Sequence, residues 1–200
     1  MAKDELERED LIRGINAVIT KLRDAGEPAG IRIIGGAALA IRYFERRTTS
    51  DVDAQLFPEE PILRAAAQVA IEQGWAEDWL NSKASTFVPA YSADVEWEVL
   101  YQDDTVTVVV ASAEALLAMK LRASRLGRDE QDIATLLSVC GVSSFDAVEE
   151  LMDKYYLGDG ISDKAMRLLT AIYQQGLPPN PKPPAPPRFG PAGNQLTTRN

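Results

Sequence analysis

Histidine is absent from the sequence, and its absence excludes several kinds of chemistry. Without an imidazole the chain cannot support Ser-His-Asp or Cys-His catalysis, nor a zinc site ligated by histidine. The single cysteine, Cys140, excludes a disulfide framework and a cysteine-ligated metal cluster, and it is typical of a protein in a reducing compartment. We therefore expect a cytoplasmic protein whose chemistry rests on carboxylates, cations, hydroxyls and bound ions.

Long apolar runs are also missing. No stretch of the sequence approaches the roughly 18 apolar residues that a membrane-spanning helix needs. Residues 1–14 carry charges throughout and lack the apolar centre of a signal peptide. We therefore expect no targeting segment and no membrane partner.

Basic residues are few: 21 Lys and Arg stand against 30 Asp and Glu, for a formal net charge of −9. The last 24 residues hold three basic residues and no acidic one, so residues 1–176 alone carry a net charge of −12. This balance argues against tight, sequence-independent binding to a phosphate backbone, which needs many Lys and Arg contacts. It leaves room for a nucleotide that is held through metal ions.

Hydrophobic periodicity divides the 200 residues into a mixed half and a helical half. It predicts helices over 3–25, 37–46, 61–74, 112–127, 128–139, 144–156 and 163–175, and strands over 31–34, 51–56, 95–101 and 105–110. Asp103 and Asp104 predict a hairpin turn between the last two strands, and Ser112 predicts a helix cap. We therefore expect an α+β core over residues 1–110 with a helical region, residues 111–176, packed on it.

The last part of the chain has a different composition. Eight of the twelve prolines lie in residues 177–200, together with one aromatic residue. Such a segment is typical of a disordered, polyproline-like tail with little apolar mass to pack. We therefore expect that deleting residues 178–200 leaves the melting temperature unchanged.

Two carboxylates form the most informative pattern of the chain. Strand periodicity places Asp51 and Asp53 on one face, roughly 6–7 Å apart at the backbone, and points Val52 to the other face. Two carboxylates this close repel each other, and a divalent cation between them, Mg²⁺ or Mn²⁺, removes the repulsion. Gly35 and Gly36 mark a strand-to-helix turn whose backbone N–H groups suit an anion. The combination predicts phosphoryl or nucleotidyl transfer, whereas each feature alone is usually a solvated strand end or a turn.

A run of Arg and hydroxyl residues leads into the first carboxylate. Arg47, Thr48 and Ser50 are suited to orient the carboxylates or to contact phosphate oxygens. The alternative interpretation is a polar loop that precedes the strand.

Lys120 lies in the middle of an otherwise apolar helix, which favours a side chain that points into a cleft. Asp129 and Asp132 follow, three residues apart on the next helix, and are candidates to support the site. The alternative is that Asp129 caps its helix and pairs with Arg125 or Arg128.

Two segments resemble known motifs. The segment GGAALAIRYFERRTTSDVD resembles the signature of the nucleotidyltransferase superfamily, and it is most similar to small bacterial nucleotidyltransferases related to abortive-infection toxins. The segment LLAMKLRASRLGRDEQDIATLL resembles the second block of the same group, a Lys-Leu-x-Ala helix followed by Arg-Asp-x-x-Asp. The positions that fit are Arg47, Thr48, Asp51, Asp53, Lys120, Leu121, Ala123, Arg128, Asp129, Asp132 and Ile133.

The resemblance implies a nucleotidyltransferase-like mixed sheet flanked by helices, and metal-dependent transfer of a nucleotidyl group from an NTP to an acceptor. The acceptor would be RNA, protein or a small molecule, and the setting would be a toxin with an antitoxin protein as its partner. By this resemblance, Asp51 and Asp53 would hold Mg²⁺ or Mn²⁺. Gly35 and Gly36 would seat the triphosphate, and Lys120 would neutralise its charge.

The superfamily normally has a third carboxylate on a neighbouring strand. Glu96 and Glu98 are the candidates for this metal ligand, although both could equally lie on a solvent face of the sheet. Two other functions therefore stay open. One is a catalytically degenerate protein of the same fold that binds a nucleotide or a partner, and the other is an aminoglycoside-type small-molecule nucleotidyltransferase, whose cationic acceptor suits an acidic chain.

Overall fold

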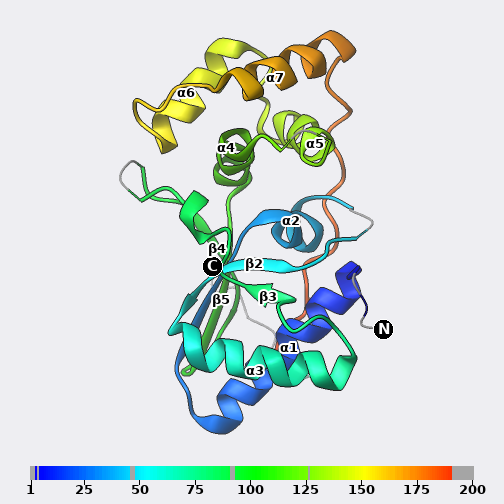
Figure 1. Cartoon of the computed structure of the whole chain (residues 1–200), viewed down its shortest axis with the longest axis vertical. Helices are drawn as coiled ribbons and strands as arrows, with labels where there is room; N and C mark the ends of the chain where they lie inside the picture. The colour runs from blue at the N-terminus through cyan, green and yellow to red at the C-terminus, as the bar shows by residue number, and fades with distance from the viewer. Residues whose placement is uncertain (1–2, 4, 46–47, 91–92, 126, 191–200) are drawn as a thin grey trace, which may run out of the picture.

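Figure 1 shows a computed structural model of the chain, which describes residues 3, 5–45, 48–90, 93–125 and 127–190. The helices are α1 (Arg8–Ala25), α2 (Gly35–Ala38), α3 (Glu59–Gln73), α4 (Ala113–Ala123), α5 (Glu130–Cys140), α6 (Phe145–Tyr155) and α7 (Asp163–Gln175). The strands are β1 (Ala29–Ile33), β2 (Val52–Phe57), β3 (Leu80–Asn81), β4 (Trp97–Gln102) and β5 (Val106–Ala111). A π-helical turn, η1 (Leu39–Tyr43), continues α2, and a short 3₁₀ turn, η2 (Ser85–Phe87), follows β3.

The strands of the described residues form one mixed sheet in the order β3-β2-β1-β5-β4. β1 lies at its centre, antiparallel to β2 and parallel to β5, while β3 runs parallel to β2 and β4 antiparallel to β5. The predicted hairpin joins β4 to β5, and the Asp103 backbone N–H donates to the Val106 carbonyl across 3.1 Å. The expected α+β fold with a helical C-terminal half is therefore confirmed.

Side chains of β1 and β2 alternate between the two faces of the sheet. Ile31, Ile33, Val52 and Ala54 are fully buried on one face, which α1 and α3 cover (Figure 1). The residues between them point to the opposite face, where Asp53 is partly buried and Arg32 is exposed. The sheet thus has one face for the core and one face that is free to carry polar chemistry.

The packing of α1 against the segment after α3 depends on a glycine. A Cβ atom at Gly14 would lie 2.7 Å from the rings of both Trp75 and Trp79. The two rings meet edge to face, with 5.1 Å between their centroids, and the Trp79 indole N–H donates to the Ala66 carbonyl across 2.9 Å. The missing side chain therefore lets the largest aromatic pair of this half approach the helix backbone.

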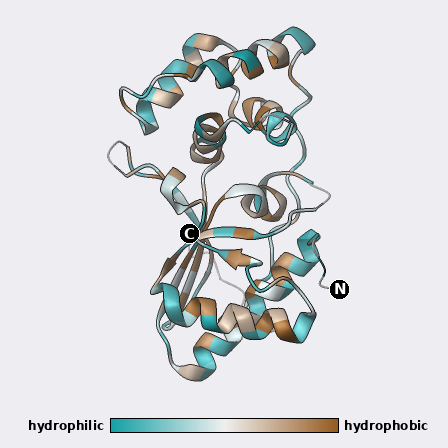
Figure 2. Ribbon diagram, viewed as in Figure 1, coloured by the Kyte–Doolittle hydropathy of each residue, from teal (hydrophilic) through white to brown (hydrophobic). Residues whose placement is uncertain are grey.

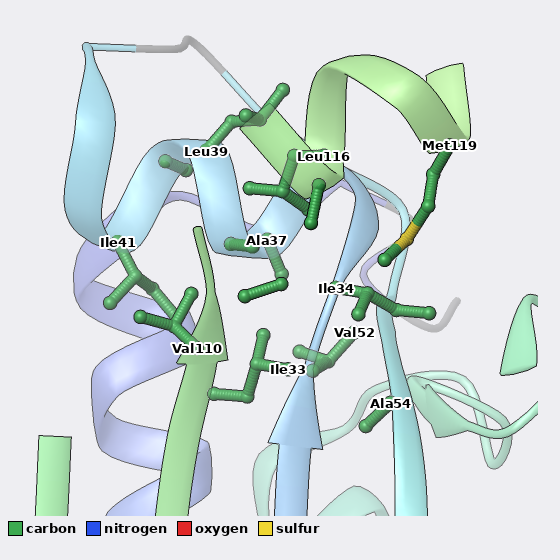
Figure 3. Packing of buried hydrophobic residues seen from close by; sticks show 14 of the residues in the cluster. Ile33, Ile34, Ala37, Leu39, Ile41, Val52, Ala54, Val110, Leu116 and Met119 are labelled. Atoms are coloured by element: carbon green, nitrogen blue, oxygen red, sulfur yellow. The ribbon is translucent and has the colours of Figure 1, made fainter. Parts of the chain in front are cut away.

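The apolar core continues from the sheet into the helical half. In Figure 3, Leu116 and Met119 of α4 point toward Ala37 of α2 and Ile34 after β1. All four residues are at most 5% exposed. Residues of the two halves thus belong to one core cluster.

Serine side chains cap helices of the C-terminal half. Ser112, Ser144 and Ser162 each accept a hydrogen bond, of 3.3, 3.2 and 3.2 Å, from the backbone N–H three residues ahead. Such caps satisfy one of the unpaired N–H groups in the first turn of a helix. The cap predicted at Ser112 is confirmed.

Hydrophilic and hydrophobic residues alternate along the outer helices, while hydrophobic residues gather on the strands and on inward helix faces (Figure 2). Among the helices that the structure describes, none is long and apolar enough to cross a membrane.

Residues 177–190, here called the strap, run from the end of α7 past α5 to α1 (Figure 1). Near its start, the Ser138 hydroxyl of α5 donates to the Pro178 carbonyl across 2.6 Å. Farther along, the Arg8 guanidinium of α1 donates to the Ala185 carbonyl, also across 2.6 Å. The strap therefore contacts both halves of the molecule.

The end of the strap is held by α1. The Asn16 side chain donates to the Arg188 carbonyl across 3.1 Å and accepts from the Gly190 backbone N–H across 2.7 Å. Between these contacts, Phe189 is 7% exposed and belongs to the core. The expectation of a disordered tail does not hold for residues 177–190; residues 191–200 lie outside the described part of the chain.

The strap can pack on the core although it is rich in proline, because proline lacks a backbone N–H donor but keeps its carbonyl acceptor. Its carbonyl groups remain free to accept hydrogen bonds from the core, and one buried aromatic ring supplies apolar contact. The proline content can be read from the composition. That side-chain donors of α1 and α5 lie within hydrogen-bond distance of the strap carbonyls can be seen only in the structure.

We predict that Phe189→Ala lowers the stability of the protein. Removing a buried ring typically costs about 3–5 kcal/mol, which corresponds to a drop of several degrees in melting temperature for a chain of this size. Thermal unfolding monitored by circular dichroism measures the effect. Lys182→Ala, at an exposed strap position, is the matched control and should leave the melting temperature unchanged. Equal melting temperatures for the two variants would show that the strap contributes nothing to stability.

Candidate active site

Two carboxylates meet at the start of β2. Asp53 is the second residue of the strand and Asp51 directly precedes it. One oxygen of Asp51 accepts from the Asn81 amide across 3.1 Å, and the other accepts from the Ser50 hydroxyl across 3.2 Å. Asn81 is 5% exposed and stands beside Asp53 in the register of β2 and β3. The short strand β3 therefore brings a buried amide to the carboxylate pair.

Gly35, at the start of α2, lies directly against Asp53. A Cβ atom at this glycine would be 2.9 Å from Oδ2 of Asp53, and the glycine has a φ of +66°. The preceding Ile34 donates its backbone N–H to the Asp53 carbonyl across 2.9 Å. Only glycine meets both demands without strain, so the structure brings the predicted glycine turn, with Gly36 next in α2, to the predicted carboxylates.

The electrostatics of Asp53 link it to the end of α4. Burial raises the pKa of the Asp53 carboxyl, and the charge of Asp51 raises it further. The positive charges of Arg125, Arg128 and Lys120 act in the opposite direction, but the pKa stays above its ordinary value. Residues of the second block of the sequence thus act on the carboxylate pair of the first.

Lys120 is enclosed in a cluster of ion pairs between α4 and α5. Its ammonium nitrogen lies 2.7 Å from Oδ1 of Asp129 and 2.8 Å from Oδ2 of Asp132. The side chains of Lys120, Asp129 and Asp132 are 7%, 0% and 7% exposed. Lys120 therefore acts on Asp53 through space, while its ammonium itself is committed to two acids rather than presented to an open cleft.

Asp129 also orients an arginine. It accepts hydrogen bonds from the backbone N–H of Arg125, across 3.1 Å, and from its Nε, across 3.0 Å. Burial raises the pKa of Asp129, but hydrogen bonds from Arg125 and Lys120 more than offset this, so its pKa lies below the ordinary value. The hydrogen bond to Asp129 in turn raises the pKa of Arg125, to which the charges of Asp53 and Asp51 contribute. The pairing of Asp129 with Arg125, left open by the sequence, is thus present together with the pairing to Lys120.

The residues that precede Asp51 contact different parts of the molecule. Ser50 donates to Asp51, as described above, whereas the Thr48 hydroxyl donates to a carboxylate oxygen of Glu5 across 3.2 Å. Arg47 lies outside the described residues. Of this run, the structure brings Ser50 to the carboxylate pair and directs Thr48 to the N-terminal segment.

Glu96 and Glu98 are not brought to the carboxylate pair. β4 is an edge strand, with β5 and β1 between it and β2, so Glu98 lies about 14 Å from β2 at ordinary strand spacing. Its register, through Val110 and Ile33 to Ala54, places it on the face opposite Asp53. Both carboxylate oxygens of Glu98 accept from Arg42, at 2.7 and 2.8 Å, and Glu96 is exposed. The expected third carboxylate is therefore not supplied by either residue.

Sequence reasoning missed Asn81 and named Arg125 only as a possible partner of Asp129. Asn81 ends a strand of two residues, too short to show any periodicity. Arg125 follows the helical stripe of α4, and its effect on Asp53 depends on how α4 sits above β2. Neither signal exists in the local sequence.

The donor chemistry of the site suits a hard cation. In the part of the chain that the structure describes, no three Asp, Glu, Cys or His side chains gather to hold a metal ion by themselves. Asp51 and Asp53 offer carboxylate oxygens, and Mg²⁺ is commonly held by one or two carboxylates together with phosphate and water oxygens. Burial raises the pKa of Asp53, and the charge of Asp51 raises it further, a repulsion that a cation would remove. The pair therefore fits a metal that shares its coordination with a phosphate ligand.

We predict that Lys120→Met destabilises the protein by about 3–5 kcal/mol, because it leaves Asp129 and Asp132 facing each other without a buried cation. Adding Asp132→Asn should recover part of the loss. Urea unfolding measures both variants. Lys154→Met, which breaks the exposed ion pair with Glu114, is the control and should cost less than about 1 kcal/mol. A loss no larger than that of the control would contradict the enclosed cluster.

Comparison with known proteins assigns the chain to a family. The profile of a family described as nucleotidyltransferase of unknown function (DUF6036) matches residues 10–176, which include the carboxylate pair and the α4–α5 cluster. Comparisons with curated proteins and with solved structures give no match. Because the match spans most of the chain and confirms the resemblance of the two sequence blocks, the chain belongs to this family of nucleotidyltransferases.

Proposed function

We propose that the protein is a metal-dependent nucleotidyltransferase that moves a nucleotidyl group from an NTP to an acceptor hydroxyl. The observation that carries the proposal is the carboxylate pair, Asp51 and Asp53, set against Gly35 and within the electrostatic reach of Arg125 and Arg128. This arrangement combines hard oxygen donors, an open backbone turn and cations at one place.

Asp51 and Asp53 would hold Mg²⁺ or Mn²⁺. When bound, such an ion neutralises phosphate charge and orients the phosphate for in-line attack. The hydrogen bonds that Asn81 and Ser50 donate to Asp51 fix that carboxylate, so its oxygens are oriented before any ligand arrives. The chain's own contribution is a rigid pair of acceptors whose repulsion favours binding of a cation.

The triphosphate would lie against the glycine turn and the cations after α4. The first backbone N–H groups of the helical segment that begins at Gly35 and Gly36 have no partner within the helix and suit phosphate oxygens. Arg125 and Arg128 are exposed and carry charge toward Asp53, so they are the better candidates to contact phosphate. Lys120, which the resemblance would place on the phosphates, would act indirectly, by holding Asp129 and through it Arg125.

A second candidate function is a nucleotide-binding protein of the same fold that does not catalyse transfer. The positions of Glu96 and Glu98, away from the carboxylate pair, favour it, because no third carboxylate from β4 is available to activate the acceptor. The two candidates differ in one measurable respect: both bind an NTP with Mg²⁺, but only the first moves the nucleotide.

The deciding experiment follows the label of each α-³²P-labelled NTP with Mg²⁺ or Mn²⁺. Total RNA, total protein and an aminoglycoside are offered as acceptors in separate reactions. Transfer to any of them establishes the first function and names the acceptor class. Binding of NTP with Mg²⁺, seen as a higher melting temperature, without transfer to any acceptor would establish the second.

We predict that Asp51→Asn and Asp53→Asn each abolish transfer and the rise in melting temperature caused by Mg²⁺ with NTP. Each variant removes one of the two charged oxygen donors while keeping the shape of the side chain. Asp153→Asn, at an exposed position of α6, should leave both measurements unchanged. Near-normal transfer by either site variant would refute the metal assignment.

We also predict an opposite effect on the protein without ligands. Because folding raises the pKa of Asp53, its ionised form costs folding free energy at neutral pH. This cost begins to fall as the pH drops to the folded pKa and is gone below the unfolded pKa. Asp53→Asn should therefore raise the melting temperature at pH 7, and the advantage should shrink in acid. Melting curves over a pH series, with Asp153→Asn as reference, measure it; a constant difference at all pH values would contradict the raised pKa.

The resemblance to abortive-infection toxins extends the proposal to the cell. The protein would be a toxin that transfers nucleotides to a cellular acceptor and is restrained by an antitoxin protein. Induced expression should then arrest growth of a bacterial host, and Asp53→Asn should relieve the arrest. Equal arrest by wild type and variant would argue against a toxic transferase.

A further inference from the structure

Arg32 stands in the middle of the open sheet face. The register places it directly opposite Gln55 of β2 and Val109 of β5. Asp53, two residues from Gln55, points to the same face, so Arg32 and Asp53 are diagonal neighbours, with about 7–8 Å between their backbones. Arg32 is therefore the cation of this face that lies next to the carboxylate pair on the side away from α4.

The guanidinium of Arg32 lies over two aromatic rings. Its central carbon lies 5.1 Å from the centroid of the Phe57 ring and 5.3 Å from that of the Trp97 ring. Phe57 is 51% exposed and Arg32 itself is exposed, so the group is accessible from solvent. The cation–π contacts hold the guanidinium near the two rings and leave N–H groups available for hydrogen bonds.

Arg32 also lacks an acidic partner in the described part of the chain. No carboxylate there forms an ion pair or hydrogen bond with it, although the chain has nine more acidic than basic residues. In a chain with so many carboxylates, an exposed and oriented arginine without one is set for an external anion.

A second observation comes from Gln55, directly opposite. Its carbonyl oxygen, Oε1, is buried and accepts no hydrogen bond from any described residue. A buried acceptor without a donor costs free energy unless a ligand or water supplies one. The side chains of Arg32 and Gln55 thus offer donors and an unused acceptor at one position.

We propose that Arg32 and Gln55 form an anion site for the acceptor, which selects acceptors that carry a phosphate or carboxylate group beside the reacting hydroxyl. This inference rests on the proposed function and adds to it the chemical class of the acceptor. The N–H groups of Arg32 would bind the anionic group, and the partly exposed side chain of Gln55 would turn its Oε1 outward to accept from a hydroxyl or N–H of the same molecule. The acceptor would then lie over the open face, with its hydroxyl toward Asp53.

The charges around the site favour an anionic acceptor over a cationic one. Arg125, Arg128 and Lys120 surround Asp53 on the α4 side, and Arg32 adds positive charge on the sheet side. A polycation such as an aminoglycoside would bring its charge against Arg32. Despite the net negative charge of the whole chain, this face disfavours the aminoglycoside-type alternative.

The test uses binding without nucleotide or metal, so that it does not depend on transfer. The probes are glycerol 3-phosphate, glycerate and glycerol, which share a hydroxyl and differ in their anionic group. The ¹H–¹⁵N signal of the Trp97 indole, assigned with Trp97→Phe, reports on the ring that stacks on Arg32. We expect saturable shifts with one or both anions and none with glycerol; the tighter anion identifies phosphate or carboxylate as the preferred group.

Arg32→Gln should weaken anion binding about tenfold or more, since it removes a charged, bidentate donor. Arg32→Lys should give an intermediate loss, because the charge stays but the planar, stacked edge is gone. Arg64→Gln, an exposed arginine of α3 that pairs with Glu27 and Glu60, is the matched control and should bind as wild type. Equal binding by Arg32→Gln and Arg64→Gln, or equal shifts with glycerol, would overturn the anion site.

Nucleotide binding separates this proposal from the proposed function. Mg²⁺ with NTP should raise the melting temperature of Arg32→Gln as much as that of wild type, because Arg32 lies on the acceptor side. Loss of this rise in Arg32→Gln would overturn the acceptor assignment and place Arg32 on the NTP. Absence of the rise in wild type, with Arg32-dependent anion binding intact, would count against the proposed function and not against the anion site.

Discussion

The repulsion between two carboxylates at the start of one strand shapes the polar structure around β2. Asp51 is held by the amide of Asn81 and the hydroxyl of Ser50, while Asp53 remains partly buried with a pKa above its ordinary value. Arg125 offsets part of the repulsion through space and is itself fixed by Asp129. The sheet half therefore supplies the negative pair, and the helical half supplies the positive charges that balance it. The continuous core between α2 and α4 holds the two groups of charges in place relative to each other.

Features that depend on neighbouring residues could be read from the sequence. Asp51 and Asp53 share a face because strands have a period of two, and the hairpin at Asp103 and the cap at Ser112 follow from local backbone chemistry. The sequence places the glycine turn and the carboxylates in one motif, but it does not show that they touch. Their contact depends on the antiparallel pairing of β1 with β2, which brings Gly35 so close that an added Cβ atom would lie 2.9 Å from Asp53.

Features that depend on the order of strands or on contact between distant segments could not be predicted from the sequence. Glu98 shares the alternation expected of a ligand, but β4 occupies the far edge of the sheet. In the sequence, Lys120 has apolar neighbours, as a residue that points into a cleft would have. In the structure, its ammonium contacts Asp129 and Asp132 instead. Phe189 is one aromatic among prolines, and its burial depends on Asn16, far away in the chain. Each of these outcomes is decided by tertiary packing, to which local periodicity is blind.

The contact between Gly35 and Asp53 also bears on how related chains change over time. While the carboxylate is present, any side chain at the glycine position collides with it. Once the carboxylate is lost, only the left-handed backbone remains as a reason for glycine, a preference of roughly 1–2 kcal/mol that drift can overcome. A relative that has replaced this glycine by a bulkier residue is therefore expected to have lost the carboxylate first, and the glycine serves as a marker of lineages in which selection still maintains the acidic pair.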